Sequence, residues 1–244
     1  MTVEVLRSGR RRRLAARTRD PALRALLETP EPDPRTPLDE LRLLAVDVET
    51  TGLVARRDRL LSVGFVPVDG RDVVLGGARS AVVRPEPGRA PVRDARPGPA
   101  RDTGVGQSAV LHGLTDDVVA SGVPVAEVLD ALFEALRGRV LLAHFARMET
   151  SFLGLACERL HGVRPPVRVV DTMTLHERVL LADTGPRPGP DALRLWSARA
   201  RYGLPASRSH DALSDALACA ELYLAQTREL AAGATLRLAD VRAA

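Results

Sequence analysis

Two acidic residues stand at the end of an apolar segment near the start of this chain. Residues 42–49 are predicted to form a strand, and Asp47 and Glu49, two positions apart, point from it to the same face. Two carboxylates ending an apolar strand are costly to remove from water unless a cation or hydrogen-bond donors meet them. The pair is therefore a candidate metal site, with a solvated strand end as the alternative.

Two further acids lie on the apolar faces of predicted helices. On a helix over 147–161, Glu149 shares a face with apolar residues three and four positions further on. On a helix over about 211–231, Asp215 likewise shares a face with apolar residues, and the chain contains no lysine to neutralise either acid. We favour a hypothesis in which the four acids gather around divalent cations. The alternative is that Glu149 and Asp215 lie at helix margins and reach water.

Four segments follow the order and spacing of the motifs of a known family. Residues 47–53 read DVETTGL, residues 112–117 read HGLTDD, residues 141–153 read LLAHFARMETSFL and residues 210–216 read HDALSDA. Over about residues 40–230, the chain resembles the DnaQ-like (DEDDh) 3′–5′ exonuclease family. This is the family of the proofreading epsilon subunit of bacterial DNA polymerase III.

The resemblance implies a fold, a reaction and roles for individual residues. It implies an α/β protein with the ribonuclease H-like fold, a mixed central sheet flanked by helices. The reaction would be metal-dependent hydrolysis of the terminal phosphodiester at a 3′ end of DNA, releasing nucleoside 5′-monophosphates. Two Mg²⁺ or Mn²⁺ ions, about 3.5–4 Å apart, would stabilise the attacking and leaving oxygens. By the matching positions, the metal-site acids would be Asp47, Glu49, Glu149 and Asp215, and His210 would be the general base.

The residues after the first two acids are also candidates. Thr50, Thr51, Gly52 and Leu53 match the family stretch that lines the 3′ nucleotide, with backbone donors and an apolar wedge against the base. Without the resemblance, the same residues would be interpreted as a turn that ends the strand, with Gly52 at positive φ.

The second motif departs from the family pattern at two positions. The usual Asp is Glu149, one methylene longer, and the usual Asn after His144 is Phe145. A displacement of about 1.5 Å at a metal-binding acid can reduce activity by about 10²-fold if nothing compensates for it. A catalytically weakened nucleic-acid-binding module therefore stays open as an alternative. An RNA 3′ exonuclease of the oligoribonuclease or ribonuclease T type is a second alternative, because nothing in the motifs distinguishes ribose from deoxyribose.

Periodicity and turn signals predict an α/β arrangement. We expect a basic N-terminal leader and Pro-rich linker over 1–37, an exonuclease domain over 38–232, a Pro- and Gly-rich loop over 85–106 and a C-terminal tail over 233–244. Strands are predicted over about 42–49, 59–68, 72–83, 139–144 and 167–170, and helices over about 20–27, 124–137, 147–161, 173–182, 191–202 and 211–231.

Composition restricts location and partners. There is no apolar run long enough to span a membrane and no secretory signal, and with Cys157 and Cys219 as the only cysteines we expect a cytoplasmic protein.

The 35 basic residues are all arginine, whose planar fork suits phosphate, and the run Arg10–Arg13 is either a phosphate contact or a solvated tail. Aromatic residues make up only 3%, which argues against an extended base-stacking platform. The expected partners are single-stranded DNA 3′ ends, with RNA as the alternative, and a DNA polymerase or repair complex.

Overall fold

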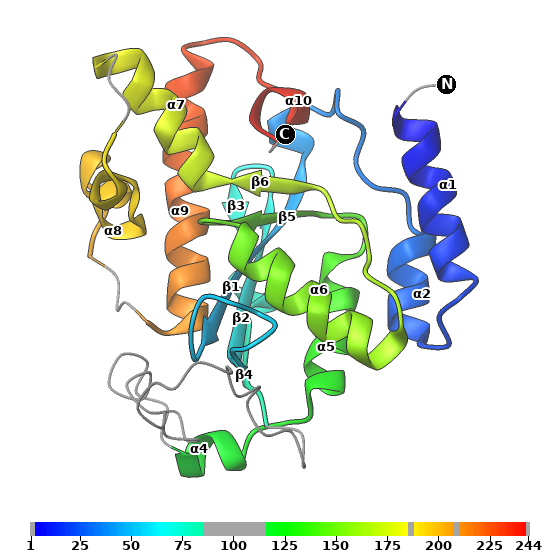
Figure 1. Ribbon diagram of the computed structural model, residues 1–244. Helices are drawn as coiled ribbons and strands as arrows, with labels where there is room; N and C mark the ends of the chain where they lie inside the picture. The colour runs from blue at the N-terminus through cyan, green and yellow to red at the C-terminus, as the bar shows by residue number, and fades with distance from the viewer. Residues whose placement is uncertain (1–2, 85–115, 185–187, 207–209, 243–244) are drawn as a thin grey trace.

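A mixed β-sheet forms the centre of the molecule (Figure 1). The computed structural model describes residues 3–84, 116–184, 188–206 and 210–242. The strands run in the order β3-β2-β1-β5-β6, with β4 paired to β2; β5 is parallel to β1 and β6, and the other pairs are antiparallel. The strands are β1 (Arg42–Thr50), β2 (Leu60–Asp69), β3 (Asp72–Val73), β4 (Arg79–Val82), β5 (Val140–Ala143) and β6 (Val169–Asp171).

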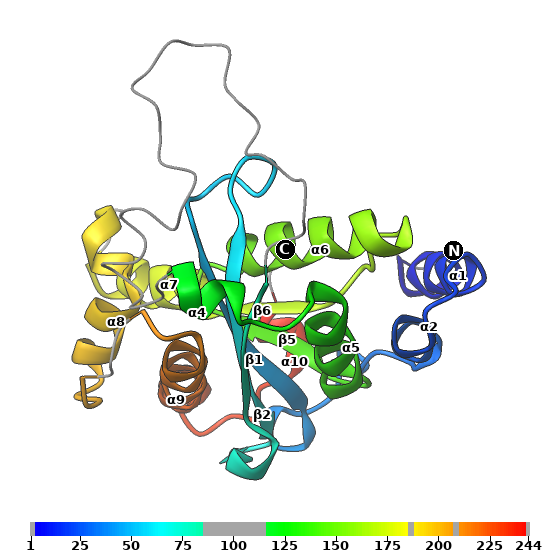
Figure 2. The same ribbon diagram turned by 90° about the horizontal axis from the view of Figure 1, so that it is seen from below.

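Helices cover both faces of this sheet (Figure 2). One face carries α9, with α7 and α8 beside it, and the other carries α5 and α6, with α1 and α2 outside them. The helices are α1 (Val3–Ala15), α2 (Pro21–Glu28), α4 (Asp116–Ala120), α5 (Val125–Leu136), α6 (Arg147–His161), α7 (Thr172–Thr184), α8 (Leu195–Arg201), α9 (Ala212–Ala231) and α10 (Leu238–Val241), and the short 3₁₀ helices are η1 (Leu38–Glu40), η2 (Leu75–Gly77) and η3 (Pro190–Leu193). None of the described helices has both the length and the apolar character needed to cross a membrane.

The alternation of side chains along β1 divides the core into two clusters. Leu44, Val46 and Val48 pack with α2, α5 and α6, whereas Leu43 and Ala45 pack with α7, α9 and α10. Because side chains two positions apart share a face, this alternation turns Asp47 and Glu49 toward the α9 side of the sheet.

The N-terminal segment packs on the helices that cover one face of the sheet. Leu23, Leu26 and Leu27 of α2 are buried in the same cluster as α5 and α6. In the arginine run, Arg11 is only 5% exposed. Its guanidinium donates to the carbonyl oxygens of Leu26, Thr29 and Pro166 and lies 3.5 Å from a carboxylate oxygen of Glu31. Arg10, Arg12 and Arg13 remain exposed.

Most predicted elements are present, and two are interrupted. The strand expected over 72–83 is broken by η2, where Gly76 and Gly77 disfavour an extended ladder. The helix expected over 191–202 is divided at Arg194, which is extended, and the Leu193 carbonyl oxygen accepts from His144 instead of continuing a helix. Part of the segment expected as a tail forms α10, which buries Leu238 and Val241. The loop expected over 85–106 lies outside the described residues, as does most of 112–117.

Candidate functional site

Three of the predicted acids meet at the end of β1. Asp47 and Glu49 of β1 and Asp215 of α9 each offer a carboxylate oxygen, and these oxygens lie within 4.8 Å of one another. Glu49 is buried and the other two are half-buried. Oxygen atoms this close, from elements distant in sequence, form a ligand set suited to a hard divalent cation.

A glycine in β2 allows α9 to approach these acids. Gly64 pairs with Asp47 across the antiparallel β1–β2 ladder, so both face α9. A Cβ atom on Gly64 would lie 2.2 Å from the backbone nitrogen of Leu213, in the first turn of α9. Asp211 caps this helix, accepting from the backbone nitrogen of Ser214 at 3.0 Å. The close contact holds Asp215, one turn into the helix, at the end of β1.

Glu149, the fourth predicted acid, lies on α6 and is not one of the three acids whose oxygens lie within 4.8 Å, but its charge raises the pKa of Asp47. Glu149 lies in the first turn of that helix, which begins beyond the carboxyl end of β5, and it is 2% exposed. Among the described residues, its Oε2 atom has no hydrogen-bond partner. Burial, with the charges of Asp171 and Glu49 as smaller contributions, raises the pKa of Glu149 to about 8. A buried carboxylate oxygen without a donor fits a site that a cation completes.

Burial and neighbouring negative charges also raise the pKa values of Asp47 and Asp215. Burial, and then the charges of Glu149 and Glu49, raise the pKa of Asp47 well above its usual range. Burial also raises the pKa of Asp215, against the lowering effect of the hydrogen bond from the backbone of His210. Negative charges on four neighbouring acids destabilise one another, and divalent cations would remove that conflict. The donor set therefore fits a hard divalent cation, which prefers carboxylate oxygen.

His210 stands beside this cluster on the connection into α9. Its backbone nitrogen donates to Oδ2 of Asp215 at 2.8 Å, and its side chain is exposed. The backbone adopts φ 67°, an uncommon conformation for a residue other than glycine. The histidine is thus fixed by its backbone beside an acid of the cluster while its ring stays accessible to water and substrate.

The segment after the acids forms a compact loop. The Thr50 hydroxyl donates to the Gly52 carbonyl oxygen at 2.7 Å, and Thr51 Oγ1 accepts from the backbone nitrogen of Arg59 at 2.9 Å. Gly52 is not at positive φ, so that expectation is wrong. Its lack of a side chain has another cause, because a Cβ atom there would lie 2.6 Å from the carboxylate of Asp58. Leu53 projects into solvent, 79% exposed, as an unburied apolar side chain next to the acids.

The connection between β5 and α6 is held by a buried acid that the motifs did not single out for this purpose. Asp171 accepts from the backbone nitrogen of Met173, at the start of α7, at 2.9 Å. It also accepts from the backbone nitrogens of Phe145 and Ala146, each at 3.0 Å. Its position at the carboxyl end of β6 is the only signal in the sequence that could have indicated these two bonds.

His144, in the same connection, is a structural residue. Its Nε2–H donates to the Leu193 carbonyl oxygen at 2.8 Å, so in the neutral ring Nδ1 accepts from the Thr172 hydroxyl at 2.9 Å. Burial lowers the pKa of His144 to about 4, which keeps the ring neutral. With both nitrogens engaged, His144 is unavailable as a metal ligand.

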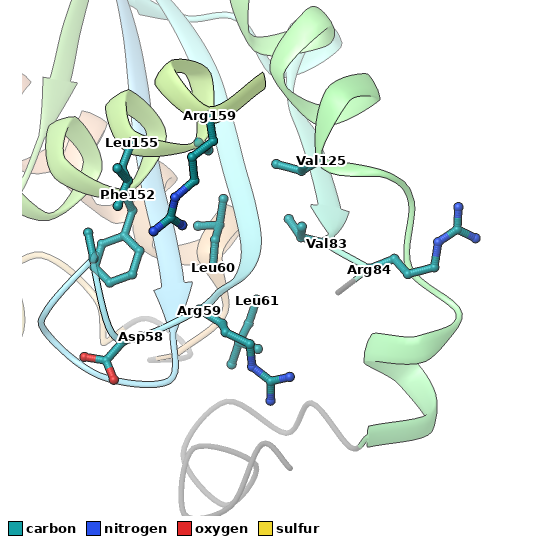
Figure 3. A pocket seen from close by; sticks show the side chains of 12 residues that line it. Asp58, Arg59, Leu60, Leu61, Val83, Arg84, Val125, Phe152, Leu155 and Arg159 are labelled. Atoms are coloured by element: carbon teal, nitrogen blue, oxygen red, sulfur yellow. The ribbon is translucent and has the colours of Figure 1, made fainter. Parts of the chain in front are cut away.

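A pocket lies between the loop after β1, strand β2 and helix α6 (Figure 3). Its apolar side chains include Leu60 of β2 and Phe152, one turn beyond Glu149 on α6. Arg59, Arg84 and Arg159 also line it, and Arg159 reaches from α6 toward the strands (Figure 3). Arg59 lies next to the loop that carries Thr51 and Gly52, whereas the Arg84 side chain points away from that loop (Figure 3).

Comparison with known families gives a match to the model RNase_T, described as an exonuclease, over residues 44–223. An epsilon-like protein of DNA polymerase III from Rhodobacter capsulatus is 32% identical over 190 residues, which are 78% of this chain and 24% of that protein. The DNA polymerase III epsilon subunit of Treponema pallidum is 26% identical over 76% of both chains. This chain thus spans about a quarter of the first relative and about three quarters of the second.

Two solved structures with a similar fold are nucleases. The complex of Escherichia coli exonuclease I with single-stranded DNA has a TM-score of 0.61 at 17% identity, over 78% of this chain and 41% of that one. The cell-death related nuclease CRN-4 has a TM-score of 0.58 at 14% identity, over 78% of this chain and 65% of that one. These likenesses establish the ribonuclease H-like fold.

Proposed function

This chain belongs to the exonuclease family described by the RNase_T model, and on that premise we propose that it removes nucleotides from the 3′ ends of single-stranded DNA. The products would be nucleoside 5′-monophosphates. The observation that carries the proposal is the acidic cluster, in which oxygens of Asp47, Glu49 and Asp215 lie within 4.8 Å, and to which buried Glu149 is electrostatically coupled.

We assign Asp47, Glu49, Glu149 and Asp215 to the binding of two divalent cations, Mg²⁺ or Mn²⁺. Bound there, the cations would stabilise the charge that develops on the phosphate and lower the pKa of a water molecule at the site. The raised pKa values of Asp47, Glu149 and Asp215 support this assignment, because they mark acids whose ionised forms have too little compensation from the protein itself.

His210 is the proposed general base. Its exposed ring can take the proton from the attacking water, and its backbone bond to Asp215 keeps the ring next to the acids. Thr50–Leu53 would hold the terminal nucleotide, with exposed Leu53 against its base. The arginines of the adjoining pocket support an approach by a phosphate backbone.

The test is release of nucleotide from a 3′-labelled single strand in Mg²⁺ or Mn²⁺. Asp47→Ala and His210→Ala should each lower the rate by at least about 10²-fold, because a cation ligand or the base is lost. Glu149→Asp tests the departure from the family pattern: the surroundings are built around glutamate, so we expect about a 10²-fold loss. Exposed Arg12, replaced by Ala, is the matched control and should leave the rate unchanged. Equal rates in all variants would refute the assignment.

The same assay distinguishes the substrates. Matched DNA and RNA oligomers of one sequence should be degraded at different rates, and we expect DNA to be preferred, since both curated relatives described above are named for DNA polymerase III. Their names also make a DNA polymerase or repair complex the proposed partner. A preference for RNA would leave the cation site in place and change only the substrate.

A further inference from the structure

Phe145 is a strained and exposed aromatic residue on the connection between β5 and α6. Its backbone has φ 68°, and its side chain is 39% exposed. For a bulky residue the left-handed region is energetically unfavourable. Core packing does not repay that cost, since the ring is not buried. Strain of this kind, held by the surrounding structure, is concentrated at functional sites.

The surrounding structure enforces this conformation. The Asp171 carboxylate accepts from the backbone nitrogens of Phe145 and Ala146, each at 3.0 Å, and the Phe145 carbonyl oxygen accepts from the backbone nitrogen of Met148 at 3.0 Å. The preceding residue, His144, is held through both ring nitrogens. The backbone that presents the Phe145 ring is therefore fixed before any ligand arrives.

The sheet register places Phe145 on one side of the acids. In the parallel β1–β5 pair, Ala45 is level with Leu142, and continuing that register brings His144 level with Asp47. Phe145 thus leaves the sheet next to Asp47, on the β5 side of β1. The loop that carries Thr50–Leu53 leads from β1 to β2, on the opposite side. The acidic cluster lies between the two.

We propose that Phe145 stacks on the base of the penultimate nucleotide, on the 5′ side of the bond that is cut. This proposal rests on the proposed function. If the terminal nucleotide occupies Thr50–Leu53 and the scissile phosphate lies at the acids, the strand continues past the acids toward β5, where the Phe145 ring is exposed. An aromatic ring accepts any base by stacking, so Phe145 would position the strand without reading its sequence.

The test combines a change in the protein with a change in the strand. Phe145→Leu keeps an apolar side chain and removes the aromatic face, and Phe145→Tyr is the conservative control. On an intact single strand, Phe145→Leu should raise KM by about 5- to 160-fold, the range of one lost stack, with kcat little changed. Phe145→Tyr should retain the wild-type KM. On a strand whose penultimate nucleotide is abasic, wild type and Phe145→Leu should have the same KM.

Two outcomes would overturn the proposal. One is an effect of Phe145→Leu that is equally large on the intact and the abasic strands, which would indicate a structural role. The other is an unchanged KM on the intact strand, which would leave the ring for another purpose, such as a protein contact. Should Phe145→Leu fail to fold, the wild-type protein supplies the test alone: an abasic penultimate nucleotide must cost more affinity than one four places from the 3′ end, and equal costs refute the stack.

The proposal can fail separately from the proposed function. Equilibrium binding of the same strands by Asp47→Ala protein, followed by fluorescence anisotropy, needs no turnover. Absence of hydrolysis by wild-type protein would refute the proposed function. The affinities of Asp47→Ala and of the double variant Asp47→Ala/Phe145→Leu would still decide whether Phe145 stacks. They should differ on the intact strand and agree on the strand with the abasic penultimate nucleotide.

Discussion

Gly64 lies directly across the β1–β2 ladder from Asp47, and α9 packs on it so closely that no side chain could be accommodated. A Cβ atom would lie 2.2 Å from the Leu213 nitrogen and 2.3 Å from the Ala212 carbonyl carbon, both backbone atoms that cannot rotate away. The absence of a side chain in β2 therefore sets the distance between two of the candidate metal ligands, Asp47 and Asp215.

The first prediction follows from this contact. Gly64→Ala should displace the first turn of α9, lower the free energy of unfolding by about 1–3 kcal/mol or more, and reduce nuclease activity together with Mn²⁺ affinity. Urea unfolding and calorimetry with Mn²⁺ measure the two effects. Gly76→Ala is the matched control, because nothing lies within 4 Å of a Cβ atom there. Unchanged Mn²⁺ affinity in a folded Gly64→Ala protein would contradict this account.

The second prediction concerns pH in the absence of metal. An acid whose pKa is raised by folding, here Glu149 to about 8, binds a proton in the folded state that the unfolded state releases above about pH 4.5. Stability must therefore fall as pH rises from about 4.5 to 8, by up to about 1.4 kcal/mol per pH unit for this group. With EDTA present, the free energy of unfolding should fall less steeply with pH for Glu149→Gln than for wild type.

Divalent cations should reverse that trend. They favour the ionised carboxylates, so Mn²⁺ should bind more tightly at pH 8 than at pH 6 and should release protons on binding. Calorimetry in buffers of different ionisation enthalpy measures the protons released. Equal pH slopes for wild type and Glu149→Gln in EDTA would show that Glu149 is ionised without metal.

The sequence predicted the elements that carry the acids better than their surroundings. The helix predicted over 147–161 has those bounds, β1 differs from its prediction by one residue, and the α/β fold is confirmed. Periodicity indicates which face of an element is apolar, and for this reason the burial of Glu149 could be anticipated. Periodicity does not indicate which residues of another element pack against that face, so the contact of Gly64 with α9 could not be predicted from the sequence.

The arginine run over residues 10–13 is a second case in which the sequence does not show contacts between distant segments. Composition alone does not distinguish Arg11, which binds three backbone carbonyl oxygens, from its exposed neighbour Arg12. The difference depends on where α2 and Pro166 lie, and those contacts are distant in sequence. Likewise, a glycine after an acidic motif indicates a turn, but only the fold shows that the carboxylate of Asp58 occupies the space next to Gly52.

The third prediction compares these two arginines. Arg11→Ala should lower the free energy of unfolding by about 2–4 kcal/mol, because it leaves buried carbonyl oxygens and part of the Glu31 charge without a donor. Arg12→Ala should change it by no more than about 0.5 kcal/mol. Both variants lose one positive charge, so urea unfolding separates the contacts from net charge. Equal effects would mean that α1 is not anchored as described.

The fourth prediction concerns Asp171, whose carboxylate links the connection before α6 to the start of α7. Asp171→Asn replaces one acceptor oxygen with an amide that faces a backbone N–H, so at least one of the three bonds is lost and a donor is left buried. We expect a loss of about 2–3 kcal/mol in the free energy of unfolding. Asp33→Asn, at an exposed acid that accepts a single backbone bond, should have little effect.

Asp171→Asn should also change catalysis, because the backbone nitrogens of Phe145 and Ala146 donate to the Asp171 carboxylate and Glu149 follows in the first turn of α6. With that backbone released, Phe145 can leave its left-handed conformation and the first turn of α6 loses its fixed starting point. Both KM and kcat should therefore change in Asp171→Asn, whereas Phe145→Leu should change KM alone. Wild-type kinetics in a folded Asp171→Asn protein would show that the carboxylate stabilises the connection without positioning either residue.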